Sequence, residues 1–398
     1  KTAYEINEGD WSSGVCSPDL LEPWGTWSRA ASASLRGRAA DLGLERGSCL
    51  AWARLNHKVE MMTMSYWKRK FFAALLFVVL IFATMLPAVA ATAAEYKLSN
   101  QFPPSHHISK GLAIFADKVK EYSQGKITIR IFDSAQLFKD TEIVEALQDG
   151  LVDIGLVATN KWGGMIPAAD VFDVPFLFVG LDSPKKFLEE GAGEILDKEF
   201  VKFGVKNLFW VDYGFIQMWN SKRPLRTPAD FAGLKMRSYS AGDSETLKAL
   251  GAAPTLMSSS EMYMALQRGT VDGATTGMPA GVSRKVYEVQ KYLTIANYST
   301  AEFCVQSNLD WWTGLDADSQ EIILRAGRDA EAWIREAIVD SEAEAEKAVR
   351  DAGLEVVVLT PEERAEFVKA TQSVKEQFVK HAGEIGGQLI ALGDKLFR

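Results

Sequence analysis

A charge-free stretch, residues 71–94, divides this chain of 398 residues into two parts. We expect only the part that follows it to form a folded domain. The stretch follows the basic cluster 68–70, is almost uninterrupted in apolar side chains as far as Leu86, and continues through Pro87 into small residues. Basic residues, an apolar core and an Ala-x-Ala-like end are typical of a secretory signal peptide. An uncleaved anchor helix is the alternative, but Pro87 and the small residues favour cleavage.

Signal peptides begin at a start methionine, and three methionines stand between residues 61 and 64. We therefore expect the signal peptide to span residues 61–94. Residues 1–60 then precede the natural start, and we expect them to be non-native upstream translation without a fold. Export predicts a periplasmic protein whose folded part begins at residue 95 and keeps one cysteine, Cys304. Its core, and not an internal disulfide bond, must then stabilise it.

The composition argues against several classes of function. The formal net charge is −8 with the acidic excess spread along the chain, whereas nucleic acid and anionic membranes require a basic face. Four histidines and three cysteines, without metal-like spacing, leave zinc chemistry and Cys/His nucleophilic catalysis few groups to use. The chain has no G-x-S-x-G, H-E-x-x-H, P-loop or G-x-G-x-x-G motif. We therefore expect a binding protein without a cofactor, not an enzyme.

Strand-like and helix-like segments alternate after residue 95. Alternating or β-branched runs predict strands, and apolar residues spaced three to four apart predict helices. The predicted order is strand 96–100, helix 108–124, strand 126–132, helix 140–149 and strand 152–157. We expect the second of these helices to start near Asp140 and to end at Gly150, as capping chemistry favours. This β-α-β-α-β order predicts a parallel sheet with helices on both faces.

A second α/β unit follows after helices near 183–203. Its predicted elements are strand 205–214, extended segment 215–221, a strand ending at Arg237, helix 241–250, strand 253–257, helix 258–269 and strand 271–277. Segment 299–309 is apolar enough to return to the first sheet; a very long helix from near Asp316, a strand at 355–359 and mostly helical residues 361–397 complete the chain. Two lobes are expected, one at 95–215 with parts of 305–398 and one at 220–300. Ligands of such folds bind in the cleft between lobes.

Several stretches between about 96 and 390 resemble, in order, the periplasmic solute receptors of tripartite ATP-independent periplasmic (TRAP) transporters, the dicarboxylate-receptor family. The matching stretches include GLAIFADKVKEYSQGKITIRIFDSAQL (111–137), EALQDGLVDIGLV (145–157), TPADFAGLKMRSYS (227–240), LGAAPTLMSSSEMYMALQRGTVDGATTG (250–277) and KVYEVQKYLT (285–294). The resemblance implies a two-lobed periplasmic binding protein fold with a long helix, here 316–351, spanning both lobes. It also implies closure over a small organic acid and delivery to a TRAP permease; an ectodomain that serves a sensor is the alternative. We expect the receptor to be a monomer.

The family's defining binding residue is an arginine in a Lys-apolar-Arg motif, which here is Lys235-Met236-Arg237. The resemblance implies that Arg237 pairs with the ligand carboxylate. A guanidinium suits that role because its planar donor fork matches a carboxylate and stays charged when water is removed. A structural ion pair is the alternative for Arg237.

Other positions carry over by local match. A sialic-acid-binding branch has an arginine, a phenylalanine and an asparagine where this chain has Gln217, Ser259 and Thr276, which argues against sialic acid as the ligand. Gln217 and Thr276 are candidates to hydrogen-bond a carboxylate or hydroxyl. Because that second arginine is absent, a ligand with a single carboxylate fits slightly better than a compact dicarboxylate. A 2-oxo-acid branch binds a cation through a Glu-Trp pair that is absent here, so we expect no metal.

Five further residues are candidates for contact with the ligand. Asn160 follows the third predicted strand, beside Trp162, and a loop-capping role is an equal alternative for its amide. His107 follows the first strand, where a solvent-bonded turn histidine is the alternative. Trp219 and Tyr239 could stack on a ligand or pack beneath the cleft.

Overall fold

The computed structural model describes residues 66–68, 70–71, 73–77 and 94–397, which belong to two separate units, 1–90 and 91–398. The described residues of the first unit are helical. No helix within the described ranges is long and apolar enough to cross a membrane. The predictions for residues 1–60 and for the cleaved end of the signal peptide lie outside the described residues.

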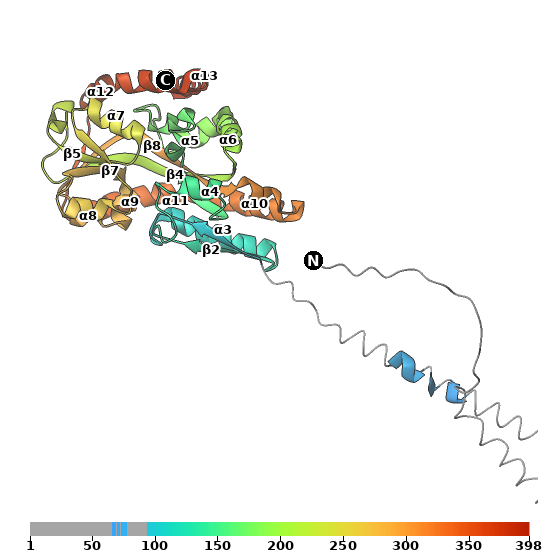
Figure 1. The fold of residues 1–398 in the computed structure, drawn as a ribbon. Coiled ribbons are helices and arrows are strands. Elements are labelled where there is room, and N and C mark those ends of the chain that lie inside the picture. The colour runs from blue at the N-terminus through green and yellow to red at the C-terminus, as the bar shows by residue number, and fades with distance from the viewer. Residues whose placement is uncertain (1–65, 69, 72, 78–93, 398) are drawn as a thin grey trace, which may run out of the picture. The chain divides into compact units, whose positions relative to one another are not determined.

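The described part of the second unit contains one nine-stranded sheet (Figure 1). Its strands in spatial order are β2-β1-β3-β8-β4-β7-β5-β6, and β9 lies beside β8. Their bounds are β1 (Ala94–Ser99), β2 (Ile127–Phe132), β3 (Ile154–Ala158), β4 (Val205–Asn220), β5 (Lys235–Ser238), β6 (Ala253–Leu256), β7 (Gly273–Gly277), β8 (Tyr292–Asn308) and β9 (Glu355–Val358).

Two long antiparallel strands, β4 and β8, connect the two ends of the sheet. The last part of β8 pairs with β3, and the last part of β4 pairs with β7. We call the end with β1–β3 the first lobe and the end with β5–β7 the second lobe. The sequence predicted a break after residue 214 and a strand only from 299, but both strands are continuous. A bulge between Asp212 and Phe215, with Gly214 at φ +99°, turns the strand without ending it.

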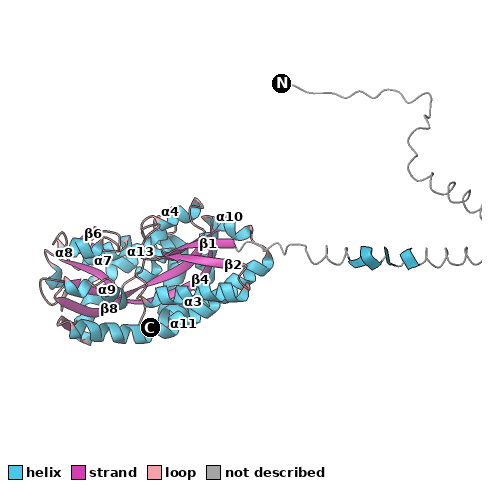
Figure 2. Cartoon of the chain, turned by 90° about the horizontal axis from the view of Figure 1, so that it is seen from below, coloured by secondary structure: helices cyan, strands magenta, loops and turns pink. Residues whose placement is uncertain are grey.

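Helices cover both faces of the sheet (Figure 2). Consecutive residues of the central strands enter different cores, since Trp210 and Cys304 pack with α5, α6 and α13 whereas Val211 and Val305 pack with α3 and α11. The helices are α3 (His107–Tyr122), α4 (Ile143–Gln148), α5 (Ser183–Phe187), α6 (Gly193–Lys202), α7 (Ala241–Ala249), α8 (Met262–Gln267), α9 (Met278–Ser283), α10 (Leu309–Thr313), α11 (Ala317–Asp351), α12 (Pro361–Ala370) and α13 (Gln372–Phe397). The α/β architecture expected from the sequence is confirmed.

The long helix α11 contributes to the cores of both lobes. Its N-terminus is capped by Asp316, whose side chain accepts a hydrogen bond from the Ser319 amide at 2.7 Å. Ile334 packs against Gly111 of α3 in the first lobe, whereas Val349 belongs to the core that includes α8 and β7 of the second lobe. The predicted long helix spanning both lobes is therefore confirmed.

Two predicted helix starts were wrong for the same physical reason. The helix expected from Asp140 begins at Ile143, and the helix expected from Ser258 begins at Met262. In both segments the side chain that resembles an N-cap is instead buried in a contact between the lobes. The side chains of Asp140 and Ser258 hydrogen-bond to each other and so do not cap the helices that follow them.

Candidate ligand-binding site

Arg237 stands on β5, a central strand of the second lobe, and is buried with 2% of its surface exposed. Its Nε donates to the Met257 carbonyl at 3.1 Å, and Nη1 donates to the Thr275 carbonyl at 2.9 Å. These carbonyls follow β6 and lie on β7, the strands on either side of β5, so the sheet itself fixes the guanidinium. Arg237 forms no ion pair with any described residue. The structural ion pair considered for Arg237 is therefore absent from the described chain.

A second arginine, Arg284, reaches the same place from the C-terminal end of α9. Its Nη2 donates to the Gln101 carbonyl and to the Ser259 hydroxyl, each at 3.3 Å, and its guanidinium carbon lies 4.7 Å from the Phe102 ring centroid. Burial lowers the pKa of Arg284, and the positive charge of Arg237 lowers it further. Within the described part of the chain, Arg284 also has no ion pair.

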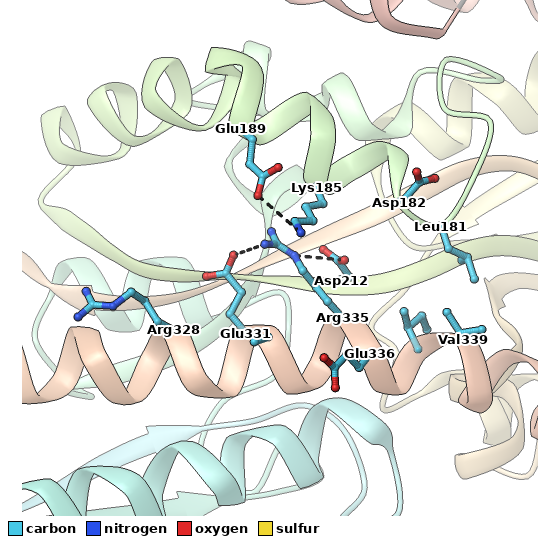
Figure 3. Close-up of a pocket in the computed structure, with 12 residues that line it drawn as sticks. Leu181, Asp182, Lys185, Glu189, Asp212, Arg328, Glu331, Arg335, Glu336 and Val339 are labelled. Atoms are coloured by element: carbon cyan, nitrogen blue, oxygen red, sulfur yellow. Dashed lines mark ion pairs between the residues drawn. The ribbon is translucent and has the colours of Figure 1, made fainter.

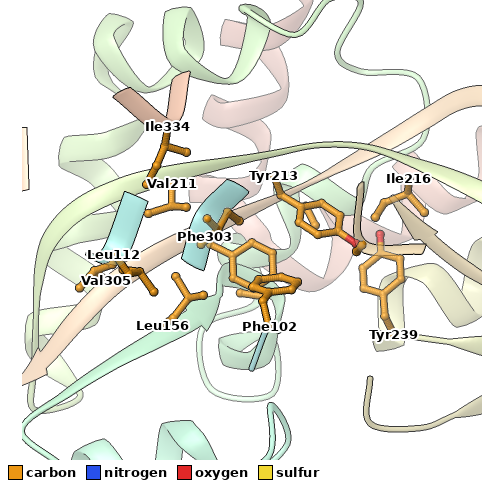
Figure 4. Packing of buried hydrophobic residues seen from close by; sticks show 14 of the residues in the cluster. Phe102, Leu112, Leu156, Val211, Tyr213, Ile216, Tyr239, Phe303, Val305 and Ile334 are labelled. Carbon is orange, nitrogen blue, oxygen red and sulfur yellow. The ribbon is translucent and has the colours of Figure 1, made fainter. Parts of the chain in front are cut away.

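Aromatic and hydroxyl groups adjoin the two arginines. The Tyr213 hydroxyl lies 2.9 Å from both Thr276 Oγ1 and the Gly277 amide nitrogen. The Tyr213 ring stacks on Phe102 with 5.7 Å between the ring centroids. Figure 4 shows both side chains within the buried cluster. Tyr213 also contributes to the electrostatic environment of both guanidinium groups. Sequence reasoning missed Arg284 and Tyr213, since neither stands in the recognised arginine motif.

His106 supplies a buried donor beside this group. Its Nδ1 accepts a hydrogen bond from the Ile108 amide at 3.2 Å, so the neutral ring carries its proton on Nε2. Nε2 is buried without a hydrogen-bond partner, and the ring stacks on Phe102 at 4.1 Å. Burial lowers the pKa of His106 well below its usual value, and His107, Arg284 and Lys110 add to the lowering. The ring is therefore neutral at physiological pH.

Asp140 of the first lobe contacts the second lobe directly. Its carboxylate accepts hydrogen bonds from the Ser258 hydroxyl and from the Ser259 amide, the latter at 3.2 Å, and pairs with Lys161 at 3.0 Å. Burial raises the pKa of Asp140, but Lys161, Ser258 and Arg237 outweigh it and hold the pKa at about 2. The carboxylate therefore stays ionised, and its charge is matched by Lys161.

A second network joins the lobes at Asp173. The carboxylate accepts hydrogen bonds from the Asn160 amide at 3.1 Å, from the Tyr239 hydroxyl at 3.0 Å and from the Ser240 hydroxyl. Burial raises the pKa of Asp173 to about 6, although these three donors oppose the rise. Two predicted contact residues, Asn160 from the first lobe and Tyr239 from the second, thus donate to the same carboxylate.

Comparison with known proteins identifies the family. The family model of the bacterial extracellular solute-binding proteins, family 7, matches residues 98–381. This chain belongs to that family. The C4-dicarboxylate-binding periplasmic protein of Rhodobacter capsulatus is 34% identical over 238 residues, which cover 59% of this chain and 71% of that protein. The resemblance to TRAP receptors is confirmed.

Two solved structures share the fold of this family 7 protein. A TRAP periplasmic solute-binding protein from Sulfurospirillum deleyianum, solved with bound succinate, has 31% identity and a TM-score of 0.71, covering 75% of this chain and 99% of its own. A sugar acid binding protein from Advenella mimigardefordensis, in complex with galactonate, has 26% identity and a TM-score of 0.74, covering 76% and 98%. The two-lobed periplasmic binding protein fold is confirmed.

Among the predicted site residues of this family 7 protein, the structure brings Arg237, Thr276 and Ser259 together around Arg284 and Tyr213. Ser259 Oγ also donates to the Gln101 side chain at 2.8 Å across the lobes. These residues form the candidate site, in which two cations meet several hydroxyl groups.

The other predicted residues are engaged elsewhere. Gln217 Oε1 accepts hydrogen bonds from the amides of Ala296 and Asn297 at 3.0 and 3.2 Å, at an irregularity in the β4–β8 pairing. The three remaining side chains are buried and hydrogen-bonded, Trp219 to the Thr276 carbonyl, Trp162 to the Gln306 side chain and His107 to the Asp212 carbonyl. Their roles as ligand contacts stay predictions, and the geometry gives each a structural partner.

A separate surface pocket of about 500 Å³ lies between α5 and α11 of this family 7 protein (Figure 3). Its central arginine, Arg335, pairs with Glu331 at 2.7 Å and with Asp212 at 3.4 Å. Lys185 pairs with Glu189 at 3.8 Å on the opposite wall. These basic groups already have acidic partners, so their charges are compensated without an anionic ligand. The charges of Arg237 and Arg284 have no such ion-pair partner among the described residues. We therefore place the candidate site at these two arginines.

Proposed function

We propose that this chain is an extracytoplasmic receptor that holds a small organic acid between its two lobes and delivers it to a TRAP-type permease in the periplasm. One observation carries the proposal: Arg237 and Arg284 meet between the lobes without an ion-pair partner among the described residues. Removing a cation from water is costly unless an anion compensates it, and a bound carboxylate would do so. Relatives that are named as transport receptors favour transport over a sensory role.

Arg237 is suited to the carboxylate that all ligands of this class share. Two of its N–H groups are fixed by backbone carbonyls, which orients the remaining N–H groups of the planar fork. A pre-oriented fork loses little entropy when it binds a carboxylate. Arg237 therefore supplies affinity for any acid of suitable size.

Arg284 supports a second polar end on the ligand. A compact dianion such as succinate can place one carboxylate on each guanidinium, whereas a sugar acid such as galactonate can place hydroxyl groups near Thr276, Tyr213 or His106. Asp140 does not neutralise this pair, because Lys161 already balances its charge. We therefore favour an acid with two anionic groups. This changes the expectation drawn from Gln217, since the second arginine comes from α9 and not from β4.

A thermal-shift screen of the full chain tests the proposal. Succinate and galactonate are the acid probes, and neutral galactose is the matched control. A bound acid should raise the melting temperature in proportion to the logarithm of its concentration above Kd. The proposal fails if galactose raises the melting temperature while neither acid nor any other carboxylate in the screen does.

A further inference from the structure

Asp140, like Asp173, accepts hydrogen bonds from the opposite lobe. Ser258 and Ser259 of the second lobe donate to its carboxylate, and Lys161 of the first lobe pairs with it. Lys161 also donates to the Tyr239 carbonyl of the second lobe at 2.8 Å. We call Asp140, Lys161, Ser258 and Ser259 the Asp140 latch. These residues lie at the boundary between the two lobes, which we call the seam. A ligand in the candidate site would lie beside it.

The latch differs from another ion pair across the same seam. Lys139 and Glu261 lie 2.8 Å apart, but their side chains are 43% and 51% exposed, whereas those of Lys161 and Asp140 are 11% and 3% exposed. Exposed pairs contribute little, because water and salt screen them. A buried hydrogen bond to a charged group contributes more, and its loss leaves a buried carboxylate short of a partner. The neighbouring residues 139 and 140 thus offer a matched comparison.

We propose that Asp140 is a positioning residue which, through Ser258, Ser259 and Lys161, sets the equilibrium between the open and closed lobes. The proposal rests on the proposed function, in which the ligand binds between the lobes. The latch residue Asp140 needs no contact with the ligand to act. If the closed form is populated less, the apparent Kd of every ligand rises by the same factor by which that population falls.

This reasoning separates the latch from the arginines. Loss of a contact to a group that only one acid carries weakens that acid alone, whereas loss of closure weakens all acids equally and also speeds exchange in the chain without ligand. Asp140→Asn removes a charge near Arg237 as well as the latch, so its effect on anions is mixed. Ser258→Ala removes one latch donor and leaves every charge in place. Ser258→Ala is therefore the deciding variant, with Glu261→Gln as the matched control in the exposed pair.

Two measurements on the full chain test the latch. Hydrogen exchange without ligand is followed in segments 172–176 and 240–244, which meet across the seam at Asp173 and contain no latch residue. Calorimetry gives the Kd of succinate and of galactonate. We expect Ser258→Ala to speed exchange in both segments and to raise both Kd values by the same factor, roughly tenfold. Glu261→Gln should change neither quantity by more than about twofold.

The outcomes are decisive in either direction. Unchanged exchange in Ser258→Ala, or Kd factors for the two acids that differ, would overturn the latch. If no carboxylate in the thermal-shift screen binds the unchanged chain, the proposed function fails, and the exchange rates without ligand alone then support or overturn the latch. Asp140→Asn should exceed Ser258→Ala in exchange, because it removes the negative charge from the latch and with it the ion pair to Lys161.

Discussion

Arg335 and Arg237 are both arginines beside the central strands, yet the structure gives them opposite surroundings. Arg335 lies in the surface pocket between α5 and α11, with acidic partners at 2.7 and 3.4 Å (Figure 3). Arg237, with Arg284 beside it, lies at the seam between the lobes and donates to neutral backbone carbonyls. The first arginine pairs directly with acidic groups, whereas the second feels the charges of Asp140 and Asp243 but forms an ion pair with no described residue. The identity of the partner, more than burial, therefore separates a structural arginine from a binding one.

The strongest test of this difference is Arg237→Ala. We expect it to cost roughly 2–5 kcal/mol of acid affinity, as for the loss of one partner of a buried charge pair. The variant should fold, because the lost side chain has no acidic partner to leave unpaired. Calorimetry with succinate measures the affinity, and circular dichroism checks the fold. Unchanged affinity in a folded variant would mean that another group holds the carboxylate.

Arg335→Met should show the reverse pattern. Its loss leaves Asp212 and Glu331 without their cation in a partly buried groove. We expect a loss of about 1–3 kcal/mol in the free energy of unfolding, less than for a fully buried pair because water reaches the groove. Acid affinity should stay within about twofold, since the groove is not the candidate site. Urea unfolding measures the stability and calorimetry measures the affinity. A variant that kept its stability but lost affinity would contradict the structural role of Arg335.

The sequence predicted Arg237 but not the arrangement around it. A short motif and the end of a strand were enough to identify Arg237, because both are local along the chain. Arg284 was invisible as a site residue, since its lack of an acidic partner is a property of the folded structure. Asp140 was interpreted as a helix cap for the same reason. The sequence around a polar side chain can predict a local role such as helix capping. Whether the side chain has that role depends on its tertiary contacts.

The fold was predicted well where periodicity was strong and less well where strands were long. The central helix α11 followed from its apolar stripe and its Asp316 cap. The strands β4 and β8 were divided in the prediction, because Gly214 looks like a turn and the first residues of β8 are not strongly apolar. A bulge continues the strand where a turn would end it. Whether a glycine forms a bulge within a strand or a turn that ends it depends on the partner strand.

Arg284→Met sharpens the comparison within the site itself. If Arg284 meets a second carboxylate, its loss should weaken succinate by about 1.5–3 kcal/mol, the range for hydrogen bonds to charged groups. Galactonate, which has one carboxylate, should lose no more than about half of that. Calorimetry with both acids gives the ratio. Equal losses would assign Arg284 to the shared carboxylate and would favour a ligand with a single anionic group.

A further expected effect is a pH dependence of stability that belongs to the Arg335 region. Glu302 is fully buried there, and burial, followed by the charge of Asp212, raises its pKa well above the usual 4.5. As the pH rises above 4.5, the unfolded chain releases this proton while the folded chain keeps it, so the free energy of unfolding falls. One group of this kind contributes at most about 1.4 kcal/mol per pH unit. Glu302→Gln should remove this contribution and leave the slope that Asp173 and the other buried carboxyl groups supply.

Ser244→Ala, a change in the second lobe away from this carboxyl pair, is the control for Glu302→Gln and should keep the slope of the unchanged chain. Urea unfolding between pH 5 and pH 8 measures the slopes, roughly the range in which native proteins are most stable. Acid affinity at the seam should follow a different course, because Asp140 has a pKa of about 2 and stays ionised, whereas Asp173 has a pKa of about 6 and ionises within this range. An undiminished slope in Glu302→Gln would place the titrating group elsewhere, with Glu342, whose pKa burial raises to about 8, as the next to replace. A reduced slope in Glu302→Gln together with an unchanged pH dependence of acid affinity would show that proton uptake in the Arg335 region and anion capture at the seam are independent.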